Sequence, residues 1–101
     1  MNDELLINAL RASGRVSGKH LELWKEVAGL MAVLDAIGRD GASAVVKIDG
    51  ARLDGAVYSV VVSGEHLGEK YFRKDGDDLS TVLREAIDFY RTSVWSDAGP
   101  R

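Results

Sequence analysis

The sequence predicts an α+β fold in which a three-stranded antiparallel meander has helices packed on one face, in the order α-α-β-β-β-α. Two observations carry this prediction. Apolar residues recur at three- and four-residue steps over residues 2–12, 19–38 and 79–95, which is the spacing of amphipathic helices. Between the second and third of these segments lie three short runs rich in β-branched and aromatic residues, separated by glycine-containing turns, which is typical of strands.

Composition limits the class of protein. The 101 residues are enough for one domain, and a hydrophobic content of 46% is normal for a globular chain. The chain has no cysteine, which excludes disulfides and thiolate metal sites. The N-terminus has no basic segment typical of a secretory signal, and no apolar run is long enough to span a membrane. We therefore expect a single cytoplasmic domain over residues 1–101, with a frayed tail over 97–101.

The N-terminal segment over residues 2–12 carries an apolar stripe and is followed by a glycine- and serine-rich connector over residues 13–18. Asn2 or Asp3 is suited to cap its start. A short helix on a flexible connector packs either on its own domain or on a second copy of the chain, and the sequence leaves both open. The stripe consists of Leu5, Leu6, Ala9 and Leu10.

The longest predicted helix covers residues 19–38, within a domain core over residues 19–96. Its apolar stripe is broad, which indicates substantial burial. Ser17 is suited to cap its start, and Gly38 or Gly41 to end it.

The first predicted strand covers residues 44–48 and is expected to lie at an unpaired edge, where a second copy of the chain could extend the sheet. Two Asp-Gly pairs follow, at 49–50 and 54–55, and both are hairpin signals. The chain reversal is therefore placed in a loop over residues 49–55, without a choice between the two pairs.

Residues 56–62 are too apolar for a strand with one wet face and predict the central strand. Residues 67–74 predict the third strand, with Tyr71 and Phe72 on opposite faces. Asp77 or Asp78 is expected to cap the last helix.

The order α-β-β-β-α, from residue 19 onward, resembles the double-stranded-RNA-binding fold. Residues 43–95 are similar in element order to HicB-type antitoxin domains. The RNA-binding fold carries a lysine cluster at the start of its last helix, which would fall at residues 77–81. Acids stand at the first two of those positions here, so the resemblance implies a fold without carrying that function.

The stretch over residues 70–74 is basic and aromatic and could contact a nucleic acid by stacking and by phosphate binding. Three aspartates follow within four residues, and their charges oppose a phosphate backbone. The net charge of −3 also has the sign opposite to that of most phosphate-binding proteins. Nucleic-acid binding is therefore the second hypothesis, through Lys70, Tyr71, Arg73 and Lys74.

Catalytic and metal-binding patterns are weak. His20 and His66 are far apart, with no ligand spacing around them, and the Asp-Gly segments lack the alternating ligands of a calcium loop. No nucleophile elbow or phosphate-binding loop is present. Glu65 and Glu69 beside His66 are the only acid–base candidate. We expect no catalytic residue, no metal and no cofactor.

The remaining hypothesis is a non-catalytic protein-binding module. Small acidic domains of this kind include bacterial or phage accessory proteins, such as immunity proteins, antitoxins and inhibitors, that mask a basic target. A homodimer is compatible with this hypothesis. Complementary charge would speed encounter with a basic partner, and an exposed tryptophan would anchor it. The predicted contact set is Asp49, Asp54, Asp75, Asp77, Asp78 and Trp95.

Overall fold

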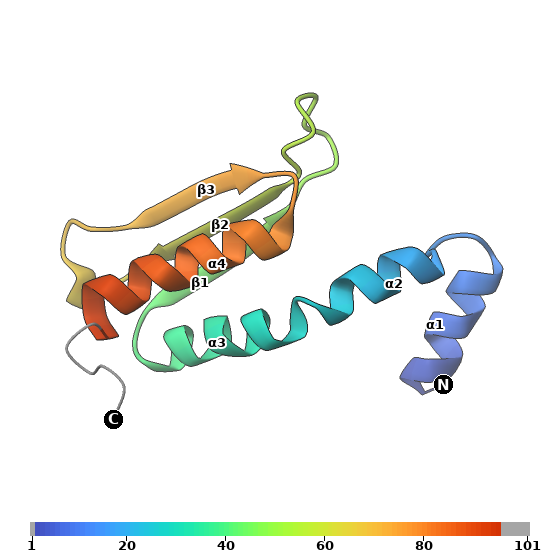
Figure 1. The fold of residues 1–101 in the computed structure, drawn as a ribbon, viewed down its shortest axis with the longest axis horizontal. Coiled ribbons are helices and arrows are strands. Elements are labelled where there is room, and N and C mark those ends of the chain that lie inside the picture. The colour runs from blue at the N-terminus through green and yellow to red at the C-terminus, as the bar shows by residue number, and fades with distance from the viewer. Residues whose placement is uncertain (1, 96–101) are drawn as a thin grey trace.

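The computed structural model describes residues 2–95 and confirms the α+β class and the antiparallel meander (Figure 1). The tail predicted over residues 97–101 lies outside the described residues. Helices and strands follow the order α1 (Asp3–Ala12), α2 (Gly18–Lys25), α3 (Ala28–Arg39), β1 (Ser43–Ile48), β2 (Tyr58–Ser63), β3 (Phe72–Gly76) and α4 (Leu79–Tyr90). A 3-10 turn, η1 (Glu65–Leu67), precedes β3, and a π-helical turn, η2 (Arg91–Trp95), follows α4.

The sheet has the strand order β1-β2-β3, so β2 is the central strand, as its apolar sequence predicts. Val60 of β2 lies opposite Val46 of β1 and Lys74 of β3, and both pairings are antiparallel. Because side chains alternate along a strand, this register places Val60 and Val62 together on the inner face.

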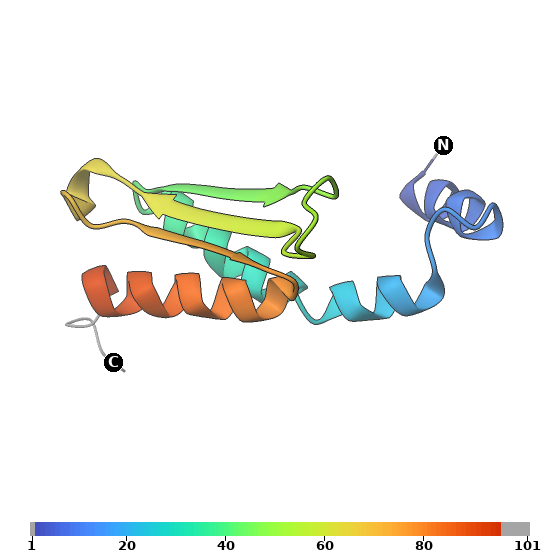
Figure 2. The ribbon, with the colours of Figure 1, turned by 90° about the horizontal axis from the view of Figure 1, so that it is seen from above.

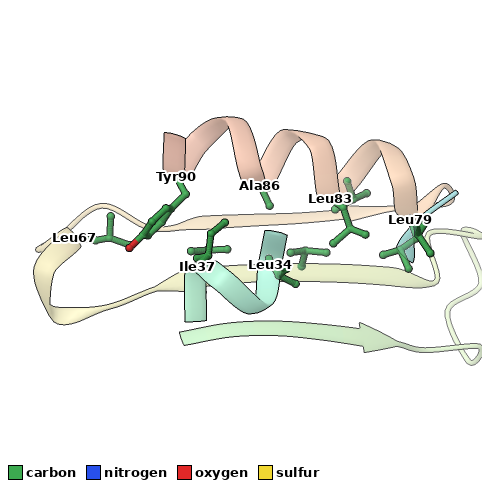
Figure 3. Packing of buried hydrophobic residues seen from close by; sticks show 11 residues of the cluster. Leu34, Ile37, Leu67, Leu79, Leu83, Ala86 and Tyr90 are labelled. Carbon is green, nitrogen blue, oxygen red and sulfur yellow. The ribbon is translucent and has the colours of Figure 1, made fainter. Parts of the chain in front are cut away.

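Helices α3 and α4 cover this inner face, and Figure 2 shows both on the same side of the sheet. Helix α4 contacts β2 and β3, while α3 contacts β1 and α4. Side chains from α3, β2 and α4 meet in one core, with Leu67 of η1 at one end (Figure 3). The fully buried members are Ile37, Val60, Val62, Leu83, Ala86 and Tyr90.

Gly76 lets β3 approach α4 closely. A Cβ atom at this position would lie 2.7 Å from Cγ2 of Val82, which is buried on α4. Only glycine fits this position without displacing the buried Val82 side chain.

The helix predicted over residues 19–38 is in fact two helices, which makes the order α-α-α-β-β-β-α. The backbone N–H groups of Glu26 and Val27 bond to carbonyls three residues back, at Leu23 and Trp24, which tightens the chain between α2 and α3. The bend is accompanied by burial of Val27, which is only 5% exposed.

The third strand begins at Phe72 rather than at the predicted residue 67. Gly68 adopts a left-handed conformation with φ of 63°, directly after η1, and the Lys70 N–H bonds back to the Leu67 carbonyl. These residues therefore form a turn, which also places Leu67 in the core. In residues 2–95, no helix has the length and apolar character needed to cross a membrane.

Replacement of Leu83 by alanine should lower the free energy of unfolding by about 3 kcal/mol, because the side chain is fully buried and leaves a cavity. Urea unfolding followed by circular dichroism measures the change. Leu53→Ala is the control, since that side chain is fully exposed in the loop after β1, and it should change stability by less than about 0.5 kcal/mol. Equal losses in the two variants would contradict this packing.

Candidate protein-binding surface

The first two helices form an N-terminal arm (residues 3–25) that projects from the sheet, with α1 at its far end (Figure 1). None of the residues of α1 is buried. Four large apolar side chains on this helix are between 38% and 57% exposed. These residues, here called the α1 apolar face, are Leu5, Leu6, Ile7 and Leu10.

Local signals favour the helical conformation of α1. The Asn2 side chain accepts a hydrogen bond from the Leu5 N–H at 2.8 Å, as the sequence suggested. Asp3 in the first turn and Arg11 in the last complement the helix dipole. Gly14, with φ of 80°, ends the helix, and the Arg15 N–H bonds to the Leu10 carbonyl at 2.9 Å.

Helix α2 joins the arm to the core. Ser17 caps it by accepting from the His20 N–H at 2.9 Å, as predicted. Trp24 packs against the core, and the His20 ring lies 6.2 Å from the Trp24 ring. Leu23 is 54% exposed, so α2 adds an apolar side chain to the uncovered surface of the arm.

A second apolar surface lies beside the edge strand. Helix α3 does not fully cover the inner face under β1, and a groove of about 470 Å³ remains between them. An ion pair between Arg39 and Asp35, 2.7 Å long, stands among the groove residues on α3. The apolar lining of this α3/β1 groove consists of Met31, Leu34, Gly38, Ala42, Ala44 and Val46.

The acidic residues predicted as a contact set lie at one end of the sheet, where β1 and β3 end and α4 begins (Figure 1). Asp49 and Asp75, however, take part in ion pairs on the outer face of the sheet. Arg52 lies 3.7 Å from Asp49 and 3.5 Å from Asp75. Lys47 also pairs with Asp49, and Arg73 with Asp75. Three cations therefore surround these two carboxylates, which offsets their negative charge.

Ser59 explains why Asp75 is held in place. Its side chain points to the outer face of β2, is almost completely buried, and donates a hydrogen bond to the Asp75 carboxylate. This bond lowers the pKa of Asp75, with smaller contributions from Arg52 and Arg73. The guanidinium of Arg52 also donates to the Ala56 carbonyl at 2.8 Å and so ties the loop to the sheet.

The other predicted acids have different roles. Asp78 stands at the start of α4, as predicted, and accepts from the hydroxyls of Thr81 and Ser80, which lowers its pKa. Asp54 accepts from the Ala56 N–H within the loop. Asp77 is exposed, and neither Asp54 nor Asp77 forms an ion pair within residues 2–95.

Trp95 lies at the opposite end of α4 from the acids, so the structure does not bring the predicted contact set together. Its ring packs edge-on against Tyr90, with centroids 4.9 Å apart, and its indole N–H donates to Asp40 at 3.1 Å. The Tyr90 hydroxyl donates to the same carboxylate at 2.6 Å, so Nε2 of His66, 2.7 Å away, donates to the Tyr90 oxygen. Burial, followed by the Asp40 contact, raises the pKa of Tyr90 to about 12.

The basic-aromatic residues are divided between contacts within the chain and solvent. Phe72 points inward against Phe89, and Tyr71 is 65% exposed, so the prediction that they face opposite ways is confirmed. Lys74 pairs with Glu85 at 2.5 Å, and Arg73 pairs with Asp75. Lys70 is exposed, without an ion pair among the described residues.

The predicted acid–base group of Glu65, His66 and Glu69 is not assembled, because its histidine contacts Tyr90. Glu65 and Glu69 are exposed, and the His66 ring is held against Tyr90. Within residues 2–95, no three histidine or acidic side chains are grouped closely enough to hold a metal ion.

Comparison with known proteins gives no relative. No protein-family model, curated sequence or solved structure matches the chain.

Sequence reasoning missed two features of the surface. Ile7 belongs to the α1 apolar face, and its apolar character in a short helix was a usable signal. Arg52 organises the outer-face ion pairs, and nothing in the spacing of the loop indicates where its long side chain lies.

Replacement of Asp75 by asparagine should reduce the loss of stability on acidification. The folded-state pKa of Asp75 is depressed, so its stabilisation is present above the pKa of an unfolded aspartate and is lost as pH falls through the folded-state value. Urea unfolding at about pH 7 and about pH 3 measures the loss. The wild type should lose more stability between the two than Asp75→Asn. Asp77→Asn is the control and should behave as the wild type; an unchanged acid sensitivity in Asp75→Asn would refute this role.

Proposed function

We propose that the protein is a non-catalytic module that binds another protein through its N-terminal arm. The observation that supports the proposal is the uncovered α1 apolar face, four large aliphatic side chains on one short helix. Isolated exposed apolar residues are ordinary, but a contiguous apolar patch on a soluble domain is typical of an interaction site.

The stability of α1 gives a second reason. The helix has ten residues, and an isolated helix of fewer than about 12 residues is marginal in water even with good caps. Packing its apolar face against a partner would supply the stabilisation that the rest of the chain does not. An amphipathic helix that lies in a hydrophobic groove is a recurrent mode of peptide recognition.

Masking of a basic target, as by an immunity protein, an antitoxin or a phage inhibitor, is a second candidate. The observation in its favour is the position of Asp54 and Asp77 at one end of the sheet, exposed and without ion pairs among the described residues. Together with the net charge of −3, they would attract a basic surface. The compensated Asp49 and Asp75 contribute less to this attraction.

The capture of partners from a lysate of the source organism, treated with nuclease, tests the role of the arm. The tagged wild type should retain a stoichiometric protein partner, and the variant Leu6→Ser/Leu10→Ser should lose it, because the substitutions remove the centre of the α1 apolar face. Mass spectrometry measures the recovery.

The control is Asn8→Ser, which places a serine at an exposed polar position of the same helix and should leave recovery unchanged. Equal recovery by the wild type and the arm variant would refute the proposal. Co-purification of nucleic acid, with proteins lost on nuclease treatment, would favour the nucleic-acid hypothesis and direct mutagenesis to Lys70 and Tyr71.

A further inference from the structure

The α1 apolar face and the α3/β1 groove are two uncovered apolar surfaces on the same chain. The groove holds about 470 Å³ and its lining is mainly aliphatic. The α1 apolar face presents four aliphatic side chains on a helix about 15 Å long. An aliphatic helix face and an open aliphatic groove are complementary in chemistry, and both are about 12 to 15 Å long.

The arm holds α1 away from the groove of its own copy. The connector between α1 and α2 is folded, since the Arg15 N–H bonds to the Leu10 carbonyl and Ser17 caps α2. Trp24 packs α2 against the core, and α1 lies at the end of the arm that is far from α3 (Figure 1). With the arm in this conformation, a helix that fills the groove comes from another chain.

Charge gives the direction of docking. Helix α1 has Asp3 and Glu4 in its first turn and Arg11 in its last. Among the groove residues on α3, Asp35 comes first and Arg39 follows one turn later. With α1 antiparallel to α3, the acidic end of α1 would lie near Arg39 and its basic end near Asp35. In the single chain these two residues pair only with each other among the described residues, and because that pair is mostly exposed, docking can add to it or replace it at little cost. The chain is thus complementary to a copy of itself.

Interface size favours exchange over simple helix pairing. Two α1 helices alone would join along strips about 15 Å long and about 10 Å wide. Each strip covers roughly 150 Å², which is far less than the roughly 800 Å² per partner of a standard interface. In a reciprocal exchange, each copy contributes one helix and one groove, and the same contact is made twice about a two-fold axis.

We infer that the protein forms a symmetric dimer in which α1 of each copy docks, antiparallel to α3, in the α3/β1 groove of the other. This inference rests on the proposed function and names the partner of the arm as a second copy of the chain. Docking would bury the α1 apolar face of one copy and the half-exposed inner side chains of β1 in the other copy.

Cross-linking between singly substituted full-length chains tests this geometry, because the natural chain has no cysteine and therefore no background reaction. A Leu6→Cys chain is mixed with an Ala44→Cys chain and treated with a short bismaleimide. The expected product is a cross-linked heterodimer. The control is a Leu6→Cys chain mixed with a Val45→Cys chain, since Val45 lies on the outer face of the same strand, and this pair should link far less.

Sedimentation velocity on the purified protein gives an independent measure. The wild type should dimerise, and Leu6→Ser/Leu10→Ser should dimerise about 10⁴-fold more weakly. Each lost leucine contact is worth about a decade of affinity, and the symmetric dimer loses two such contacts on each of its two docked helices. Asn8→Ser, an exposed polar position of α1 outside the α1 apolar face and the charged ends, should dimerise as the wild type does. Circular dichroism verifies that all variants remain folded.

Three results would overturn the inference: a wild type that stays monomeric, a Leu6→Cys chain that links chiefly to itself, and a dimer that survives Leu6→Ser/Leu10→Ser but is lost in Val45→Glu. The second would indicate pairing of α1 helices, and the third would indicate pairing of β1 edges. A monomeric wild type that still captures an arm-dependent partner from lysate would end the inference and leave the proposed function standing.

Discussion

The packing of α4 against the inner face of β2 is the interaction on which the rest of the structure depends. The fully buried Val60 and Val62 meet Leu83 and Ala86 there, and Gly76 allows β3 to lie close beside the same helix. Helix α3 packs beside α4 and covers part of β1, so the α3/β1 groove stays open. A three-stranded sheet offers one inner face of limited width, and two helices occupy it. Helix α1 does not share this face, and it lies at the far end of the arm with its apolar side chains uncovered.

Most of the fold could be predicted from the spacing of apolar residues, because the repeats of helices and strands are local properties of the chain. The central place of β2 followed from its run of valines, and the opposite orientations of Tyr71 and Phe72 followed from strand alternation. The bend before α3 could not be predicted, since no proline or glycine stands at residues 26–27, and the burial of Val27 is a tertiary effect. The late start of β3 depends on the backbone conformation of Gly68.

The candidate site was less predictable than the fold, because it depends on contacts between distant residues. Neighbouring acids suggested a negative patch, but Arg52 reaches Asp75 from a loop before β2 and offsets part of that charge. Asp40 precedes the three strands in the sequence, whereas its hydrogen-bond partners Tyr90 and Trp95 follow them. These long-range bonds give Trp95 a role within its own chain. The apolar stripe of α1 was visible in the sequence, whereas its exposure was visible only in three dimensions.

The bend between α2 and α3 affects how the molecule unfolds locally. A continuous helix would transmit the rigidity of the core into the arm through an unbroken ladder of i to i−4 hydrogen bonds. Here that ladder is interrupted at Glu26 and Val27, where the bonds span three residues instead. The residues before the bend and those after it can therefore lose their structure in separate steps. Amide hydrogens of the arm are expected to exchange by local opening, and those of β2 and α4 only by unfolding of the whole core, so the chain has two levels of stability within one short sequence.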